Sequence, residues 1–245
     1  MLSDEQIRVY RRTGHLTVLD VFSAQQIEAA LDDLAIWSEE FLRSLAPEQR
    51  DWYLDEDSSN EIRLRKLDNP VFHRDVFREL ATDTRLTDMV RQLIGHDLSV
   101  FFSQVFMKPP DGGGPKPIHQ DNFYFGPEDL DATLTVWVAL DAATTQNGCL
   151  YYADSHQQEI VPHIAPTGQP FNLQIPKHLA EIYRMVPEPV PRGGVSFHHG
   201  NTPHQSAANH SDRPRRAAAF HYLRNDARLV SAALPYDDSM RVSIP

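Results

Sequence analysis

The chain has 245 residues, of which 41% are hydrophobic, so it can bury a large core within one domain. Its formal charge of −11 disfavours binding to nucleic acid or to anionic membranes, because phosphate surfaces are held mainly by basic side chains. Cys149 is the single cysteine, which excludes an intramolecular disulfide. We therefore expect a small-molecule partner, and the composition leaves the oligomeric state open.

Location is predicted from what the sequence lacks. It contains no run of about 20 apolar residues, and its first residues have no secretory pattern, so we expect no membrane partner and a cytoplasmic protein. Arg8-Val9 followed by His15-Leu16 resembles a peroxisomal targeting nonapeptide. These residues fall in a predicted helix and its glycine stop, which disfavours targeting.

Capping signatures predict helices in the first part of the chain. Ser3 with Gln6, and Ser23 with Gln26, have the spacing of a capping box. The first helix is expected to end at Gly14, and the second continues as a long amphipathic stripe. The other elements expected before residue 95 are a strand over 16–21 and helices over 71–80 and 84–94. The acidic, polar segment 51–60 is interpreted as a surface loop, with a mobile lid as the alternative.

After Gly95 the hydrophobic periodicity changes from helical to strand-like. The expected strands are 99–108, 117–121, 133–140, 149–153, 159–163, 183–186, 194–198, 215–223 and a last one near 228–233. Strands and helices do not alternate, so a mainly β fold with N-terminal helices is predicted, either an antiparallel sandwich or a jelly roll (cupin-like). We expect one domain over 1–245, with 1–95 as a mainly helical flank and 96–245 as the β core.

A histidine and an aspartate two residues apart suggest a metal site. On a strand, His119 and Asp121 point to the same side, because successive side chains alternate between faces. The pattern is weak by itself, since His73-Arg74-Asp75 and His210-Ser211-Asp212 repeat it. The first repeat lies in a predicted helix and the second in a turn-rich loop. Context therefore favours His119 and Asp121.

A third ligand is needed, and the turn before His204 supplies one. Two imidazoles and one carboxylate form the facial triad of non-haem Fe(II) sites, which leaves positions open for an organic co-substrate and O₂. An alternative is a zinc or nickel site made by His198, His199 and His204. That alternative is disfavoured because adjacent strand residues point to opposite faces.

Arg215 is the candidate anion-binding residue. On the strand it begins, Arg215 shares a face with Ala217 and Ala219, whose small side chains leave room for a ligand. A guanidinium presents a planar fork of donors suited to a carboxylate. The alternative is that Arg213, Arg215 and Arg216 form a solvated basic turn.

Ordered blocks of sequence resemble the phytanoyl-CoA dioxygenase-like branch of the Fe(II)/2-oxoglutarate-dependent oxygenases. The blocks are His119-Gln120-Asp121, the run 134–141, Gln146-Asn147-Gly148-Cys149-Leu150, Ser155-His156, and 204–215 with its His204-Gln205-Ser206 and Arg213-Pro214-Arg215. The chain departs from the family at Ala153-Asp154, where Pro-Gly is usual, and at Gly193-Gly194, where Gly-Asp is usual. Those departures affect turns and leave the proposed ligands unchanged.

The resemblance implies a double-stranded β-helix and a set of site residues. It implies iron ligation by His119, Asp121 and His204, and it implies that Arg215 holds the distal carboxylate of 2-oxoglutarate. It further places three residues around the co-substrate, namely Trp137, Ser206 and Gln104. From the residues alone, Trp137 is equally well explained as a core aromatic.

The implied function is that of an Fe(II)/2-oxoglutarate-dependent dioxygenase. The expected reaction uses O₂ to hydroxylate an unactivated C–H bond of a small metabolite or natural-product intermediate, with release of succinate and CO₂. Desaturation, cyclisation or epoxidation by the same iron chemistry is the alternative within this class. A non-catalytic metal-binding barrel is the alternative from another class.

Overall fold

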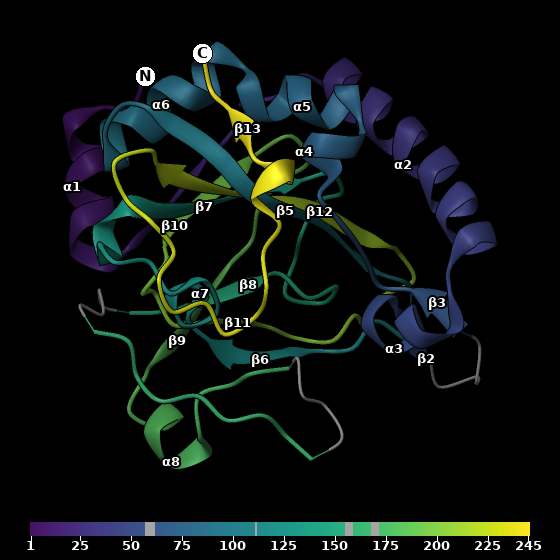
Figure 1. The fold of residues 1–245 in the computed structure, drawn as a ribbon. Coiled ribbons are helices and arrows are strands. Elements are labelled where there is room, and N and C mark those ends of the chain that lie inside the picture. Colours follow the sequence, from purple (N-terminus) through teal and green to yellow (C-terminus); the bar gives the residue numbers. More distant parts are fainter. Residues whose placement is uncertain (57–61, 111, 155–158, 168–171) are drawn as a thin grey trace.

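The computed structural model describes residues 1–56, 62–110, 112–154, 159–167 and 172–245. Within these segments, helices from the first part of the chain arch over a large sheet, and a smaller sheet lies beneath it (Figure 1). The helices are α1 (Asp4–Thr13), α2 (Ala24–Ser44), α3 (Arg50–Tyr53), α4 (Pro70–His73), α5 (Asp75–Thr82), α6 (Thr84–Ile94), α7 (Asp121–Phe125) and α8 (Lys177–Ala180). Short 3-10 turns occur at Pro47–Gln49, Leu130–Ala132 and Asp238–Met240.

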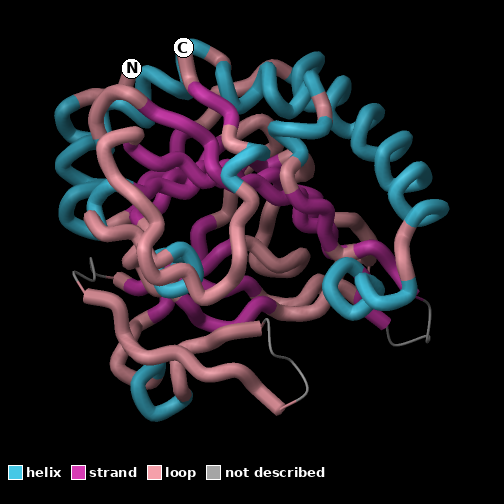
Figure 2. The backbone as a smooth tube through the Cα atoms, in the orientation of Figure 1, coloured by secondary structure: helices cyan, strands magenta, loops and turns pink. Residues whose placement is uncertain are grey.

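Every strand pairing in the described residues is antiparallel. Figure 2 shows the strands (magenta) gathered beneath the helices of the first part of the chain (cyan). The large sheet has the order β1-β10-β7-β12-β5-β13, with β4 also paired to β5. Its strands are β1 (His15–Val18), β4 (Lys66–Asp68), β5 (Leu98–Lys108), β7 (Thr133–Ala139), β10 (Val195–His199), β12 (Arg215–Arg224) and β13 (Val242–Ser243). The smaller sheet, of order β6-β11-β8-β9, contains β6 (Lys116–His119), β8 (Leu150–Ala153), β9 (Met185–Glu188) and β11 (His204–Ser206). A separate pair joins β2 (Leu54–Glu56) to β3 (Ile62–Leu64).

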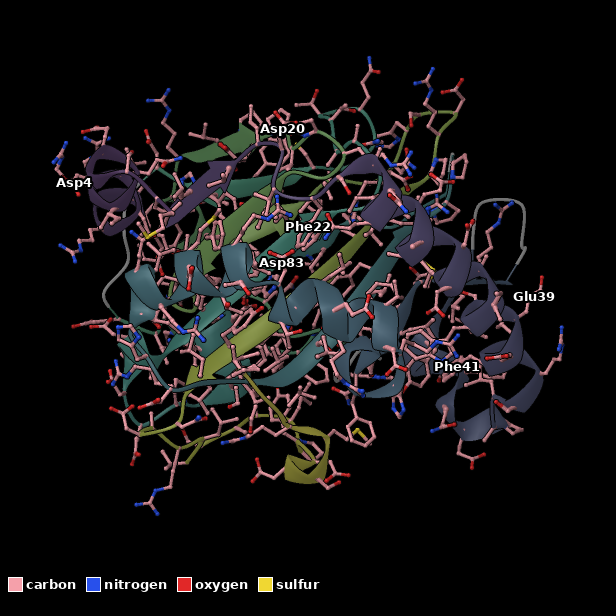
Figure 3. All side chains as sticks on the ribbon, turned by 90° about the horizontal axis from the view of Figure 1, so that it is seen from above. Asp4, Asp20, Phe22, Glu39, Phe41 and Asp83 are labelled. Atoms are coloured by element: carbon pink, nitrogen blue, oxygen red, sulfur yellow. The ribbon has the colours of Figure 1, made fainter. Side chains whose placement is uncertain are left out.

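The two faces of the large sheet have different surroundings. On β12, Phe220 and Tyr222 belong to the main core, which they share with residues of the N-terminal helices. The alternating residues Ala217 and Ala219 instead pack with Trp137 in a second cluster that includes residues of the smaller sheet. The helices therefore cover the outer face (Figure 3), and the inner face is turned toward the smaller sheet.

The predicted helix caps are confirmed. Ser3 and Ser23 each complete a capping box with the glutamine three residues on, and Gly14 ends α1 with a φ of 78°. The start of α2 also makes tertiary contacts, since the Gln26 side chain donates to Asp83 Oδ2 at 3.4 Å. Figure 3 shows Phe22 and Asp83 close together where α2 and α6 begin.

One predicted helix is divided in two. The segment 71–80 was expected to be continuous, but α4 ends at His73 and α5 begins at Asp75. Between them Arg74 is extended, with a φ of −132°. Its guanidinium pairs with Asp33 on α2 at 2.6 Å, so an ion pair between helices accompanies the break.

Two predicted strands are wrong. Residues 159–163 form no strand, and their backbone is bound instead by a side chain, because Gln120 accepts from Val161 N and donates to Glu159 O. Residues 228–233 form one isolated bridge, between Leu229 and Pro127. In the segment 51–60, the described part contributes to α3 and β2, and the remainder lies outside the described residues. No described helix is both long and apolar enough to cross a membrane.

Gly200 lies where the turn before β11 contacts the start of α7. Its carbonyl accepts from Asn122 N at 2.8 Å, which ties the turn before β11 to α7. A Cβ at this position would lie 2.0 Å from Asn122 Oδ1 and 2.5 Å from Thr133 Oγ1. A side chain here must therefore push apart buried neighbours.

We predict that Gly200→Ala lowers the free energy of unfolding by about 1–3 kcal/mol, the usual cost of overpacking. Urea unfolding followed by circular dichroism measures this difference. Gly114→Ala is the matched control, because its Cβ would meet Asp55 Oδ2 at an ordinary 3.8 Å. Equal stability of the two variants would contradict the tight contact.

Candidate active site

Three ligating side chains meet between the two sheets. His119 ends β6, Asp121 begins α7, and His204 begins β11. One ligand atom from each residue lies within 4.8 Å of the others, and all three residues are buried. Asp121 Oδ1 is 3.7 Å from the Nε2 atom of each histidine. This is the one such group of three among the described residues.

The predicted strand 117–121 needs a correction. The strand ends at His119, and Asp121 is already the first residue of a short helix. Gln120 between them is nevertheless extended, with φ −120° and ψ 133°. Local alternation is therefore kept through Gln120, and this directs His119 and Asp121 to the same side.

Backbone carbonyls fix the orientation of the two imidazoles. His119 Nδ1 lies 2.8 Å from Pro117 O, and His204 Nδ1 lies 3.0 Å from Thr202 O. A carbonyl can only accept, so we assign the ring proton to Nδ1 in both residues. Each Nε2 then offers its lone pair toward Asp121, which is how ligating histidines are commonly held.

The second oxygen of Asp121 is held by other strands. Thr135 on β7 donates to Oδ2 at 2.5 Å, and His198 Nε2 on β10 lies 3.1 Å from the same atom. Behind His198, the Tyr152 hydroxyl is 3.0 Å from Nδ1. Asp121 therefore presents Oδ1 to His119 and His204, while Oδ2 is anchored. The roles of Thr135 and His198 were missed in the sequence, although Thr135 alternates in phase with Trp137.

The protonation states suit metal binding. Burial, together with His204 and Lys116, holds the pKa of His119 well below its ordinary value. Burial and His198 lower the pKa of His204 to about 4. For Asp121, burial acts to raise the pKa, but His204 and His198 hold it well below its usual range. At neutral pH the cluster therefore offers two neutral imidazoles and a carboxylate, the forms that bind metals.

Arg215 is buried on the inner face without a counter-charge in contact. Arg215 is only 3% exposed, and its Nε atom has no hydrogen-bond partner. No carboxylate in the described residues forms an ion pair with its guanidinium. Burial lowers its pKa only to about 10, so it remains a cation. The guanidinium carbon lies 5.6 Å from the centre of the Trp137 ring. A buried cation in this state is costly unless an anion binds it.

The other predicted co-substrate residues also belong to this region. Ser206 accepts from Lys108 Nζ at 2.9 Å, and Lys108 is the cross-strand partner of Arg215. Gln104 is the partner of Ala219 on the same pair of strands, and it donates to Asp68 Oδ1 at 2.7 Å. Lys108 was missed in the sequence. Strand alternation alone predicts its position, because Lys108 stands four residues after Gln104 and therefore points to the same face.

Of the two competing histidines, His198 faces the cluster and His199 does not. His199 points away from the cluster and makes contact with Asp131 at 3.0 Å, whereas His198 faces Asp121. The structure therefore does not bring His198, His199 and His204 together as a zinc or nickel site. His73 and His210 are both exposed, and His156 lies outside the described residues. Cys149 is buried within the apolar cluster around Trp137.

Two antiparallel sheets that enclose two histidines and one carboxylate are typical of non-haem Fe(II) oxygenases. A family model described as phytanoyl-CoA dioxygenase (PhyH) matches residues 10–217. The chain therefore belongs to this family of Fe(II)/2-oxoglutarate-dependent oxygenases, and the predicted double-stranded β-helix is confirmed by similarity to solved members of that fold.

Relatives of the chain catalyse different reactions. It is 26% identical over 221 residues to the methylphosphonate hydroxylase of Gimesia maris, covering 90% of this chain and 80% of the relative. The structure of the 2-oxoglutarate-dependent carbocyclase SnoK from nogalamycin biosynthesis is similar with a TM-score of 0.77 and 25% identity, covering 100% and 97% of the two chains. The epimerase SnoN, solved with Fe³⁺, 2-oxoglutarate (alpha ketoglutarate) and nogalamycin RO, has a TM-score of 0.71 and 24% identity, covering 91% and 84%.

We predict that His119→Ala, Asp121→Ala and His204→Ala each weaken Fe(II) binding strongly. The loss should exceed the roughly 10- to 100-fold cost of removing a residue that only supports a ligand. Anaerobic equilibrium dialysis with Fe(II) measures it. The exposed His210→Ala is the control, and normal iron affinity in His204→Ala would remove His204 from the site.

Proposed function

We propose that this chain hydroxylates an unactivated C–H bond of a small metabolite or natural-product intermediate. In this proposal His119, Asp121 and His204 hold Fe(II), and Arg215 holds the distal carboxylate of 2-oxoglutarate, with Trp137, Ser206 and Gln104 around the co-substrate. Bound iron and 2-oxoglutarate supply the oxidising chemistry, in which O₂ provides one oxygen atom to the product and one to succinate as CO₂ is released.

One observation carries the proposal. A buried guanidinium without an ion-pair partner in the described residues lies on the inner face that also faces the cluster of ligating side chains. A structural metal site would need the three ligands but would leave the burial of Arg215 uncompensated. A dicarboxylate co-substrate accounts for both features, because one end can bind the metal and the other can pair with Arg215.

The donor set fits iron rather than a closed structural metal site. Two imidazoles and one carboxylate oxygen leave room for further ligands, and structural zinc more often has four protein ligands. The anchored Oδ2 of Asp121 supports binding through Oδ1 alone. His119 and His204 would act as neutral ligands, fixed in place by the carbonyls of Pro117 and Thr202.

Hydroxylation is preferred because the methylphosphonate hydroxylase is related over most of both chains. Its named substrate is a small anion, which also supports a small-metabolite substrate here. Similarity to the carbocyclase SnoK along the full chain favours cyclisation as the second candidate. We further propose that residues 1–245 work as one domain, since the N-terminal helices share the main core with β7, β10 and β12.

The reaction is tested by oxygen-dependent succinate formation. We predict that the protein with Fe(II) and 2-oxoglutarate forms succinate, slowly without the true substrate, and that His204→Ala forms none above background. Anaerobic samples and samples without iron are the controls. A wild-type protein that binds iron but neither binds nor consumes 2-oxoglutarate would favour the non-catalytic metal-binding barrel.

We predict that Arg215→Ala raises the concentration of 2-oxoglutarate needed for half-maximal succinate formation by roughly 10- to 150-fold. This corresponds to the ~1.5–3 kcal/mol of a hydrogen bond to a charged group. Fe(II) affinity should change little, because Arg215 is no ligand. Arg213→Ala is the control, since Arg213 is exposed. The same defect in Arg213→Ala would show that the co-substrate arginine is wrongly assigned.

A further inference from the structure

The few lysines of this acidic protein are concentrated near the candidate site. The chain has four lysines, at positions 66, 108, 116 and 177. Lys66 and Lys108 are only 6% and 7% exposed, Lys116 is partly buried, and Lys177 is exposed on α8. Lysine is almost never fully buried unless it is paired. In a chain with a net charge of −11, this placement calls for an explanation.

An irregularity in β6 directs Lys116 toward the metal cluster. Along β11, His204 pairs with His119 and Ser206 pairs with Lys116. The three residues 204–206 of β11 are thus matched by the four residues 116–119 of β6, as in a β-bulge, which re-aims a side chain. The extra residue brings Lys116 to the side of β6 that carries His119, although strict alternation would put them on opposite sides.

Neutral groups hold the Lys116 ammonium. Its Nζ donates to the Tyr124 hydroxyl at 2.8 Å and to Asn172 Oδ1 at 3.0 Å. The Tyr124 hydroxyl donates to Leu173 O at 2.7 Å, so its oxygen is free to accept from Lys116. An ammonium has three protons. One ammonium proton of Lys116 therefore remains to donate to a ligand.

No carboxylate in the described part of the chain forms an ion pair with Lys116. The neighbouring cations differ, since Lys66 pairs with Asp68 at 3.5 Å and Arg65 with Asp55 at 3.6 Å. Burial and Arg65 lower the pKa of Lys116 to about 8 although Asp121 acts to raise it, so most of the population is charged at neutral pH. The charge of Asp121 is already shared among the groups of the metal cluster.

The surroundings of Lys116 differ from those of Arg215. The Tyr124 ring that supports the ammonium is edge-on to the His119 ring, with centroids 5.7 Å apart. Tyr124 also belongs to an apolar cluster with Phe101 and Phe125. Arg215 and Lys108 lie instead beside Ser206 and Trp137. Two cationic positions therefore flank the cluster of ligating side chains, and 2-oxoglutarate is assigned to the one at Arg215.

We propose that Lys116, supported by Tyr124, binds an anionic group of the substrate, a carboxylate or a phosphonate. This inference rests on the proposed function and names the substrate class of the same site. Lys116 is thus a specificity-determining residue, which positions the substrate relative to the metal without serving as a ligand.

Binding of small anions to the loaded protein tests this inference. The protein with Fe(II) and 2-oxoglutarate, kept anaerobic, is titrated with methylphosphonate, propionate and the neutral propionamide by calorimetry. We predict that the anions bind more tightly than propionamide, and that Lys116→Met weakens their binding about ten-fold or more. The affinity for 2-oxoglutarate should change by less than about two-fold. The tighter of the two anions identifies the headgroup.

Two variants serve as controls. Lys177→Met removes an exposed lysine and should leave anion binding unchanged. Lys116→Arg keeps the charge and should retain most of the affinity, which separates loss of charge from loss of folding. Unchanged anion binding in Lys116→Met, a wild type that does not prefer the anions, or weakened 2-oxoglutarate binding in Lys116→Met would each overturn the inference. A wild type that binds no 2-oxoglutarate at all would instead refute the proposed function.

Discussion

The buried charge of Asp121 is the constraint on which the site depends. A carboxylate in the interior is costly unless it is paired and hydrogen-bonded. Here His119 and His204 face one oxygen, while Thr135 and His198 hold the other. These four partners come from four strands, two in each sheet. The carboxylate is therefore stable only when the two sheets face each other, so folding and site formation require the same arrangement.

Positive charge on the inner face complements that arrangement. Arg215 and Lys108 are cross-strand partners, and both are buried. Burial and Arg215 lower the pKa of Lys108 to about 6, so at neutral pH Arg215 carries the positive charge of this pair. A buried guanidinium is consistent with an interior prepared for an anion, in a protein whose total charge is negative. The relatives, which include a hydroxylase, a carbocyclase and an epimerase, indicate that one fold supports several outcomes.

Local patterns with a direct physical cause were predicted well. The capping boxes at Ser3 and Ser23 require only residues three positions apart. The alternation that puts Arg215, Ala217 and Ala219 on one face follows from the strand period. The predicted secondary structure was wrong where contacts between residues far apart in the sequence determine the local backbone. Arg74 interrupts the helix expected over 71–80 and pairs with Asp33. The Gln120 side chain makes hydrogen bonds to the backbone of 159–163, where a neighbouring strand was expected to make them.

The sequence by itself determined the fold class, the family resemblance and the residues that could ligate a metal, because periodicity, caps and motif spacing are local properties. It also placed Arg215 beside small side chains. Only the tertiary structure decided that His198 supports Asp121 rather than competing for the metal, and that Lys108 stands opposite Arg215. It likewise decided the direction of Lys116, because the irregularity in β6 depends on its pairing with β11. Those features rest on register between strands far apart in the chain, and a pattern with a period of two residues cannot specify which strands become neighbours.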